Sequence, residues 1–129
     1  AYSGGHIVHG CANAMYLPKV IKYNSKVESA AERYADIARF IKLEGNTTEE
    51  LVEALIAEIK KMNAALNIPT CIKEYEGGII DEKEFMDKLP QVAELAIGDA
   101  CTGSNPRQPS QEEMEKLLKA CYYDLPIDF

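Results

Sequence analysis

The sequence predicts an all-α protein, a helical bundle of about five to six helices. Apolar residues recur at intervals of three and four along most of the chain, which is the period of an amphipathic helix. No segment shows the alternation of apolar and polar residues that is typical of a strand. At 129 residues the chain has the length of one domain, and a chain of this size can bury a single hydrophobic core.

The first half of the chain predicts three helices, at about residues 10–24, 26–43 and 48–66. Pro18 lies inside the first of them. Because proline has no backbone N–H and its ring clashes with the preceding turn, we expect this helix to kink or restart near Leu17. Thr47 or Thr48 can cap the third helix, which should end before Pro69.

The second half predicts further helices at about residues 82–88, 90–100 and 111–123. The segment 70–80 before them is the least regular of the chain, and a short extended piece or a turn is expected there. Asp81 is a suitable N-cap, and Pro90 suits the first turn of a fresh helix. Ser110 followed by Glu113 is the pattern of a capping box and should start the last helix.

Charge and composition exclude several classes of function. The net charge is −7 and the pI is near 4.8, and the lysines are spread among glutamates, so a nucleic-acid partner is not expected. No apolar run approaches the roughly 20 residues that span a bilayer, so no membrane partner is expected either. The chain has no pattern of a secretory signal. These features predict a cytoplasmic protein.

The four cysteines stand far apart in the sequence, at Cys11, Cys71, Cys101 and Cys121. They form no CxxC pair, which argues against a structural zinc site. In a reducing compartment such residues are usually small buried apolar side chains without disulfides. Cys101 precedes a loop and can line a cavity there, but no basic neighbour in the sequence identifies it as a nucleophile.

The two histidines of the chain, His6 and His9, lie three positions apart between Gly4–Gly5 and Gly10. On a helix this spacing would put both imidazoles on one face, within reach of one metal ion. A lone pair without a third ligand at fixed spacing is a weak signal, however. The alternative is a pair of ordinary polar residues at the start of a helix, and the spacing alone leaves both open.

The stretch CTGSNPRQPS, residues 101–110, is expected to be a loop. Asn105 can bond to nearby backbone, and Pro106 fixes the following turn. Arg107 offers a planar fork of donors that matches a carboxylate. We expect one buried ion pair through Arg107 to hold this loop.

The chain begins Ala-Tyr-Ser without methionine, and its strongest chemistry lies within the first ten residues. A metal site usually takes ligands from several elements of a fold. We therefore expect the sequence to be a piece of a longer polypeptide.

Three segments, HGCANAMYLPKVIKYN, LNIPTCIKEYEGGIIDEKEF and DACTGSNPRQPSQEEMEKLLKACY, together resemble the C-terminal helical domain of the iron-containing (group III) alcohol dehydrogenases. The resemblance covers nearly the whole chain. Its two patterns, HGxxNAxxLPxVxxYN and CTGxNPR, are specific in combination. On this resemblance, residues 1–129 are a C-terminal all-α domain segment of a two-domain dehydrogenase, without the N-terminal cofactor domain.

The resemblance implies a metal site. Members of the family bind a divalent metal, Fe²⁺ or sometimes Zn²⁺, through one Asp and three His. The last of these histidines matches His9, whereas His6 matches a position that is not a ligand and is expected at the mouth of the site. Cys101 matches a position expected near the substrate channel. The Asp and the first two His ligands lie upstream in the family and are absent from this chain.

The resemblance also implies a function, which is hydride transfer between a small alcohol or aldehyde and NAD or NADP, with the metal polarising the substrate oxygen. The cofactor binds mainly to the missing domain, and its binding residues are not identified. With one of four ligands, the isolated segment should bind metal weakly and be inactive. Its partners would be the remainder of its own polypeptide and, in a possible homo-oligomer, further copies. The alternative is a non-catalytic all-α interaction module.

Overall fold

The computed structural model describes residues 6–129. Within this range the chain forms five α-helices, two short 3₁₀ helices and no strand, so the all-α prediction is confirmed. In chain order these elements are α1 (His9–Asn24), α2 (Glu28–Phe40), α3 (Thr48–Ala65), η1 (Ile72–Gly77), α4 (Glu82–Gly98), η2 (Thr102–Ser104) and α5 (Gln111–Tyr123). None of the helices in residues 6–129 combines the length and the apolar character needed to cross a membrane.

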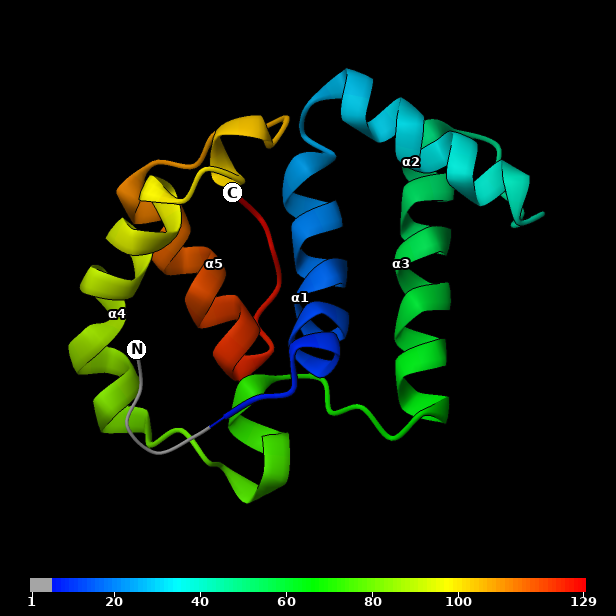
Figure 1. Ribbon diagram of the computed structural model, residues 1–129. Helices are drawn as coiled ribbons and strands as arrows, with labels where there is room; N and C mark the ends of the chain where they lie inside the picture. Colours follow the sequence, from blue (N-terminus) through cyan, green and yellow to red (C-terminus); the bar gives the residue numbers. More distant parts are fainter. Residues whose placement is uncertain (1–5) are drawn as a thin grey trace.

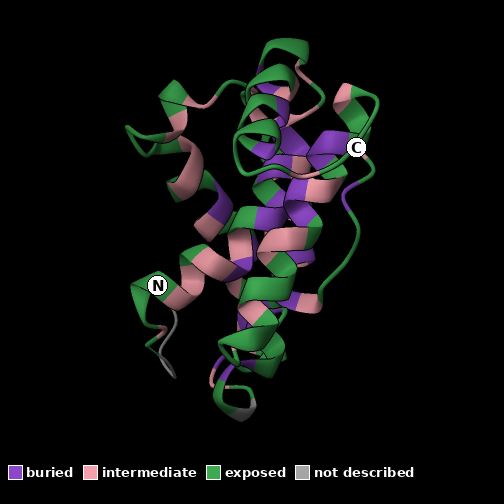
Figure 2. Cartoon of the chain, turned by 90° about the vertical axis from the view of Figure 1, so that its right-hand side faces the viewer, coloured by how far each residue is buried: buried purple, intermediate pink, exposed green. Residues whose placement is uncertain are grey.

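Helix α1 is the central element of the fold and lies between α3 and α5 (Figure 1). Each of three buried clusters takes one side chain from it. Met15 packs with residues of η1, α4 and α5. Ile21 packs with α2 and α3, and Tyr23 packs with α5 and the segment that follows it. The buried residues accordingly concentrate along the inside of the bundle (Figure 2).

The predicted restart of the helix near Pro18 is wrong, because α1 runs through this proline without a break. Proline cannot donate to the carbonyl four residues earlier, which is that of Ala14. The side-chain amide Nδ2 of Asn63 on α3 donates to this carbonyl oxygen instead, at 2.8 Å. A contact between helices 49 positions apart therefore replaces the missing backbone bond.

The predicted restart at Pro90 is also wrong, since α4 is one helix from Glu82 to Gly98. Pro90 and Met86, whose carbonyl loses its partner, both lie on the exposed side of α4. Water can solvate that carbonyl, so the helix continues at modest cost. The two helices predicted here are one, and the bundle has five α-helices within residues 6–129.

The predicted helix starts are confirmed by their N-caps. The side chains of Thr47 and Asp81 each accept a hydrogen bond from the backbone N–H three residues on, at 3.1 Å. Ser110 and Glu113 form the complete capping box. Because these bonds satisfy N–H groups that have no partner inside the helix, local sequence is sufficient to place the three starts.

The irregular segment 70–80 contains a 3₁₀ helix, where an extended piece or a turn was expected. Ile72 and Tyr75 are both buried in the cluster around Phe85. Residues three apart lie on the same side of a 3₁₀ turn, so the turn that begins at Ile72 buries both side chains, and the helical geometry is interrupted at Tyr75 and Glu76. Gly78 follows with φ +92°, a conformation that glycine adopts without strain.

Candidate metal centre at the start of helix α1

His9 is the first residue of α1, and its imidazole is exposed. Its Nε2 lies 3.1 Å from Nδ2 of Asn13, one turn further along the same side of the helix. Val8 provides no side-chain cap. The structure thus presents one imidazole at the open end of a helix, with a single amide beside it.

The chain around His9 is anchored from the opposite side. Ile7 and Cys11 pack against the cluster that contains Tyr75. The backbone N–H of Val8 donates to the hydroxyl oxygen of Tyr75 at 3.4 Å. Because the flanking side chains point into the core, the imidazole of His9 is directed outwards.

His6 is exposed and lies before α1 begins, so the two histidines do not share a helical face. Gly4–Gly5, which were expected to flank the pair, lie outside the described residues. Two residues of non-helical chain, Ile7 and Val8, separate His6 from the helix start. The structure keeps His6 in the same part of the molecule as His9 without placing both on one element.

Cys101 lies at the other end of α1. It precedes η2, and the loop that follows is joined to Asn24, the last residue of α1, through Asn105. Helix α1 has 16 residues and is therefore about 24 Å long. Figure 1 shows this loop and the start of α1 at opposite ends of the helix. The structure does not bring Cys101 and His9 together.

Within residues 6–129, the chain offers one candidate ligand of a metal site, His9, and no complete set of ligands. No group of three or more His, Cys, Asp or Glu side chains within residues 6–129 is arranged to hold a metal ion. His9 itself suits a divalent ion such as Fe²⁺ or Zn²⁺, because a neutral imidazole nitrogen binds such ions and this one is reachable from solvent. The amide of Asn13 is exposed, so a metal ion can displace it from the nitrogen at small cost.

The loop after Cys101 is held by Arg107, as the sequence predicts. Nη2 of Arg107 forms an ion pair with Oε1 of Glu113 at 2.7 Å, and both side chains are partly buried. Nη1 donates to the carbonyl oxygens of Tyr23 at 3.1 Å and Phe129 at 2.8 Å. The guanidinium also lies 3.8 Å from the ring centroid of Tyr23. These contacts make Arg107 a structural residue.

A second contact that holds this loop, between the side chains of Asn24 and Asn105, was not predicted. The side-chain amides of Asn24 and Asn105 form two hydrogen bonds with each other, at 3.0 and 2.8 Å. Asn24 is only 2% exposed, so its amide needs such a partner. Both asparagines are fixed positions of the patterns HGxxNAxxLPxVxxYN and CTGxNPR, but the patterns do not indicate that these side chains, 81 positions apart, meet.

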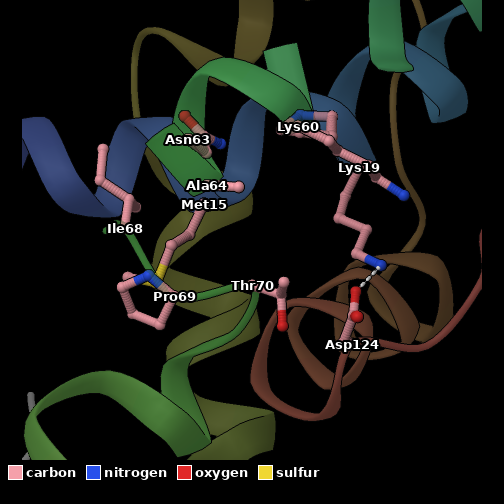
Figure 3. A pocket seen from close by; sticks show the side chains of 10 residues that line it. Met15, Lys19, Lys60, Asn63, Ala64, Ile68, Pro69, Thr70 and Asp124 are labelled. Carbon is pink, nitrogen blue, oxygen red and sulfur yellow. Dashed lines mark hydrogen bonds and ion pairs between the residues drawn. The ribbon is translucent and has the colours of Figure 1, made fainter. Parts of the chain in front are cut away.

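The described part of the chain also contains a small cavity of about 90 Å³ beside α1 (Figure 3). Lys19, Asn63 and Asp124 are among its lining residues. Nζ of Lys19 is paired with Oδ1 of Asp124 at 2.6 Å and donates to the carbonyl oxygen of Leu125 at 2.8 Å. The buried lysine therefore secures the segment after α5.

The exposure of the four cysteines predicts the order in which a thiol reagent modifies them. All four cysteines are free, Cys101 is exposed, and Cys71 and Cys121 are buried. Burial raises the pKa of the Cys121 thiol to about 12, so hardly any thiolate is present there at pH 8. A maleimide reagent should label Cys101 first and leave Cys71 and Cys121 unmodified until the protein unfolds, as read by peptide mass spectrometry. Fast labelling of Cys121 in the native protein would contradict the structure.

The fold and the site define an all-α domain that offers one candidate metal ligand. A family model described as "Fe-containing alcohol dehydrogenase family, C-terminal" matches residues 3–122. The chain therefore belongs to the Fe-containing alcohol dehydrogenase family and corresponds to its C-terminal part. This confirms the resemblance found in the sequence.

Relatives of known identity agree with this assignment. The chain is 55% identical over 124 residues to the NADPH-dependent butanol dehydrogenase of Clostridium saccharobutylicum, and the match covers 96% of this chain and 31% of that protein. An alcohol dehydrogenase of Thermococcus barophilus is 38% identical over 116 residues. The iron-containing alcohol dehydrogenase of Thermococcus thioreducens is similar in structure, with a TM-score of 0.74 and 33% identity over 90% of this chain and 28% of that one. The chain spans less than a third of the length of these relatives.

Proposed function

We propose that residues 1–129 are the C-terminal all-α segment of a two-domain, iron-dependent alcohol dehydrogenase, and that His9 is one of its metal ligands. The exposed, outward-directed imidazole at the start of α1 is the observation that carries the proposal. Family membership and the names of the relatives support the reaction class. The segment alone, with one ligand, would be inactive.

The reaction would be hydride transfer between a small alcohol or aldehyde and a nicotinamide cofactor. A butanol dehydrogenase at 55% identity supports a short-chain alcohol, and the NADPH dependence of that relative favours NADPH over NADH. The cofactor would bind mainly to the part of the polypeptide outside this chain. The enzyme would work in the cytoplasm, and a homo-oligomer is compatible with the proposal.

The chain's own residues would position the chemistry. A divalent ion at this site, Fe²⁺ or Zn²⁺, supplies Lewis-acid polarisation of the substrate oxygen. His9 would hold the ion through a ring nitrogen, while Ile7 and Cys11 keep the helix start in place from the core side. His6 would lie at the mouth of the site. Cys101 has no part in this proposal, because its loop is joined to the far end of α1.

The test is the iron content of the full-length polypeptide. His9→Ala should lower the bound iron per chain roughly tenfold or more, since even outer-shell changes weaken metal sites by 10–100-fold. His6→Ala is the matched control and should retain the iron of the parent protein. Equal iron in the parent and in His9→Ala, measured by elemental analysis, would exclude His9 as a ligand.

A further inference from the structure

One side of α1 is exposed to solvent, and none of its exposed residues is an Asp, Glu, Lys or Arg. The exposed residues of α1 are His9, Gly10, Asn13, Leu17 and Val20. At about 100° per residue, His9, Asn13, Leu17 and Val20 fall within roughly 80° around the helix axis, so they lie on one side. We call these four residues the α1 stripe. The stripe begins with the imidazole of His9 at the N-terminal end of α1 and is apolar towards the C-terminal end, at Leu17 and Val20.

The other helices have exposed surfaces of a different kind. Charged residues make up much of the exposed surface of α2, namely Glu28, Glu32, Arg33, Asp36 and Arg39. The exposed apolar residues Phe40 and Met86 each have a charged, exposed neighbour in the sequence, Arg39 and Asp87. A solvent-facing helix normally presents such charged positions. The α1 stripe differs from these surfaces in that no exposed residue of α1 is an Asp, Glu, Lys or Arg.

The remaining sides of α1 are already covered. Met15, Ile21 and Tyr23 each enter a different buried cluster, and the helix stands between α3 and α5 (Figure 1). The stripe is thus the uncovered side of a core helix.

We propose that the α1 stripe is the surface on which the preceding part of the same polypeptide packs. The proposal rests on the proposed function, since the occupant would also bring the other metal ligands to His9. The occupant presents an uncharged, aliphatic surface to Leu17 and Val20.

The relatives indicate why the occupant is this part of the chain. More than two thirds of the butanol dehydrogenase and of the T. thioreducens enzyme lies outside the matched segment. The matching family model is the C-terminal one, so the additional chain of these relatives lies on the N-terminal side of the matched segment. Because His9 and Leu17 lie on the same side of α1, an element that reaches His9 from this side also covers Leu17.

The test compares two similar positions in the full-length polypeptide. Leu17 is 45% exposed in this structure and Met86 on α4 is 41% exposed. Leu17→Glu should lower the thermal unfolding midpoint by roughly 5 °C or more, because the carboxylate would be buried without a partner. Met86→Glu should leave the midpoint nearly unchanged. Equal midpoints for the two variants would overturn the proposal.

A second pair of variants keeps the test decisive if Leu17→Glu does not fold. In the native full-length protein, Leu17→Cys should be at least tenfold slower than Met86→Cys in maleimide labelling, with each position read by peptide mass spectrometry. Equal labelling rates would overturn the proposal. Protection of Leu17→Cys that disappears on dilution to monomers would assign the stripe to a second copy and overturn it too.

The two proposals fail in different ways. If Leu17→Cys is protected but His9→Ala keeps its iron, the packing surface stands and the ligand assignment fails. If His9→Ala loses its iron but Leu17→Cys labels freely, the ligand assignment stands and the packing surface fails.

Discussion

Replacing Arg107 with alanine is expected to lower the free energy of unfolding by about 3 kcal/mol, because hydrogen bonds to charged groups contribute the most and their loss leaves acceptors unpaired. The change removes the ion pair with Glu113 at 2.7 Å. It also removes the donors to the carbonyl oxygens of Tyr23 and Phe129. The contact of the guanidinium with the Tyr23 ring is lost as well. The loop, the end of α1 and the segment after α5 would all be loosened.

Arg39→Ala is the matched control. Its ion pair with Asp36, at 2.8 Å, is exposed on both sides, so its loss should be barely measurable in urea unfolding. Arg107→Lys should fall between the two, since an ammonium keeps the charge and loses the planar fork. If Arg107→Ala unfolds at the same urea concentration as Arg39→Ala, the loop is not held in the way described.

The same contact predicts a pH dependence. The pKa of Glu113 is lowered, first by the hydrogen bond from the backbone N–H of Ser110, and further by Tyr23 and Arg107. A carboxyl whose folded pKa is depressed stabilises the protein above its unfolded pKa, and this stabilisation is lost as the pH falls through the folded value. The stability difference between the parent protein and Arg107→Ala should therefore be largest near neutral pH and shrink in acid.

Much of the fold could be predicted from local sequence. The caps at Thr47, Asp81 and Ser110 are confirmed because each bond lies within four residues. The continuity of α1 through Pro18 was missed, since it depends on a side chain of α3 that has no signal near the proline. Local sequence shows that a proline removes one backbone hydrogen bond from a helix. Only the tertiary structure shows that a side chain of another helix replaces that bond.

The site was predictable only in part. Spacing left His6 and His9 equivalent, and the family resemblance separated them. The structure adds that His9 starts α1 and is exposed, which no periodicity indicates. The remaining ligands cannot be deduced from this sequence because it contains no other histidine. The pair formed by Asn24 and Asn105 was missed for a different reason, since both positions belong to the two sequence patterns but only the fold brings their side chains together.

Phe85→Ala is expected to have the largest effect on stability, about 4 kcal/mol, which is within the usual cost of truncating a buried phenylalanine. Phe85 is 1% exposed and stacks on Tyr122 with ring centroids 4.1 Å apart. Its edge contact with Tyr123 would also be lost. Phe40→Ala is the same substitution at a side chain that is 86% exposed, and it should leave the unfolding midpoint nearly unchanged.

This substitution also tests how the candidate ligand is held. The cluster around Phe85 includes Tyr75 and takes up Ile7, so it supports the chain just before His9. Phe85→Ala should therefore speed hydrogen exchange of the amide of Val8, which donates to the Tyr75 hydroxyl, more than it speeds exchange in the middle of α3. A uniform increase over both regions would mean that the start of α1 depends only on global stability. A selective increase would show that the core under Phe85 positions the imidazole at the surface.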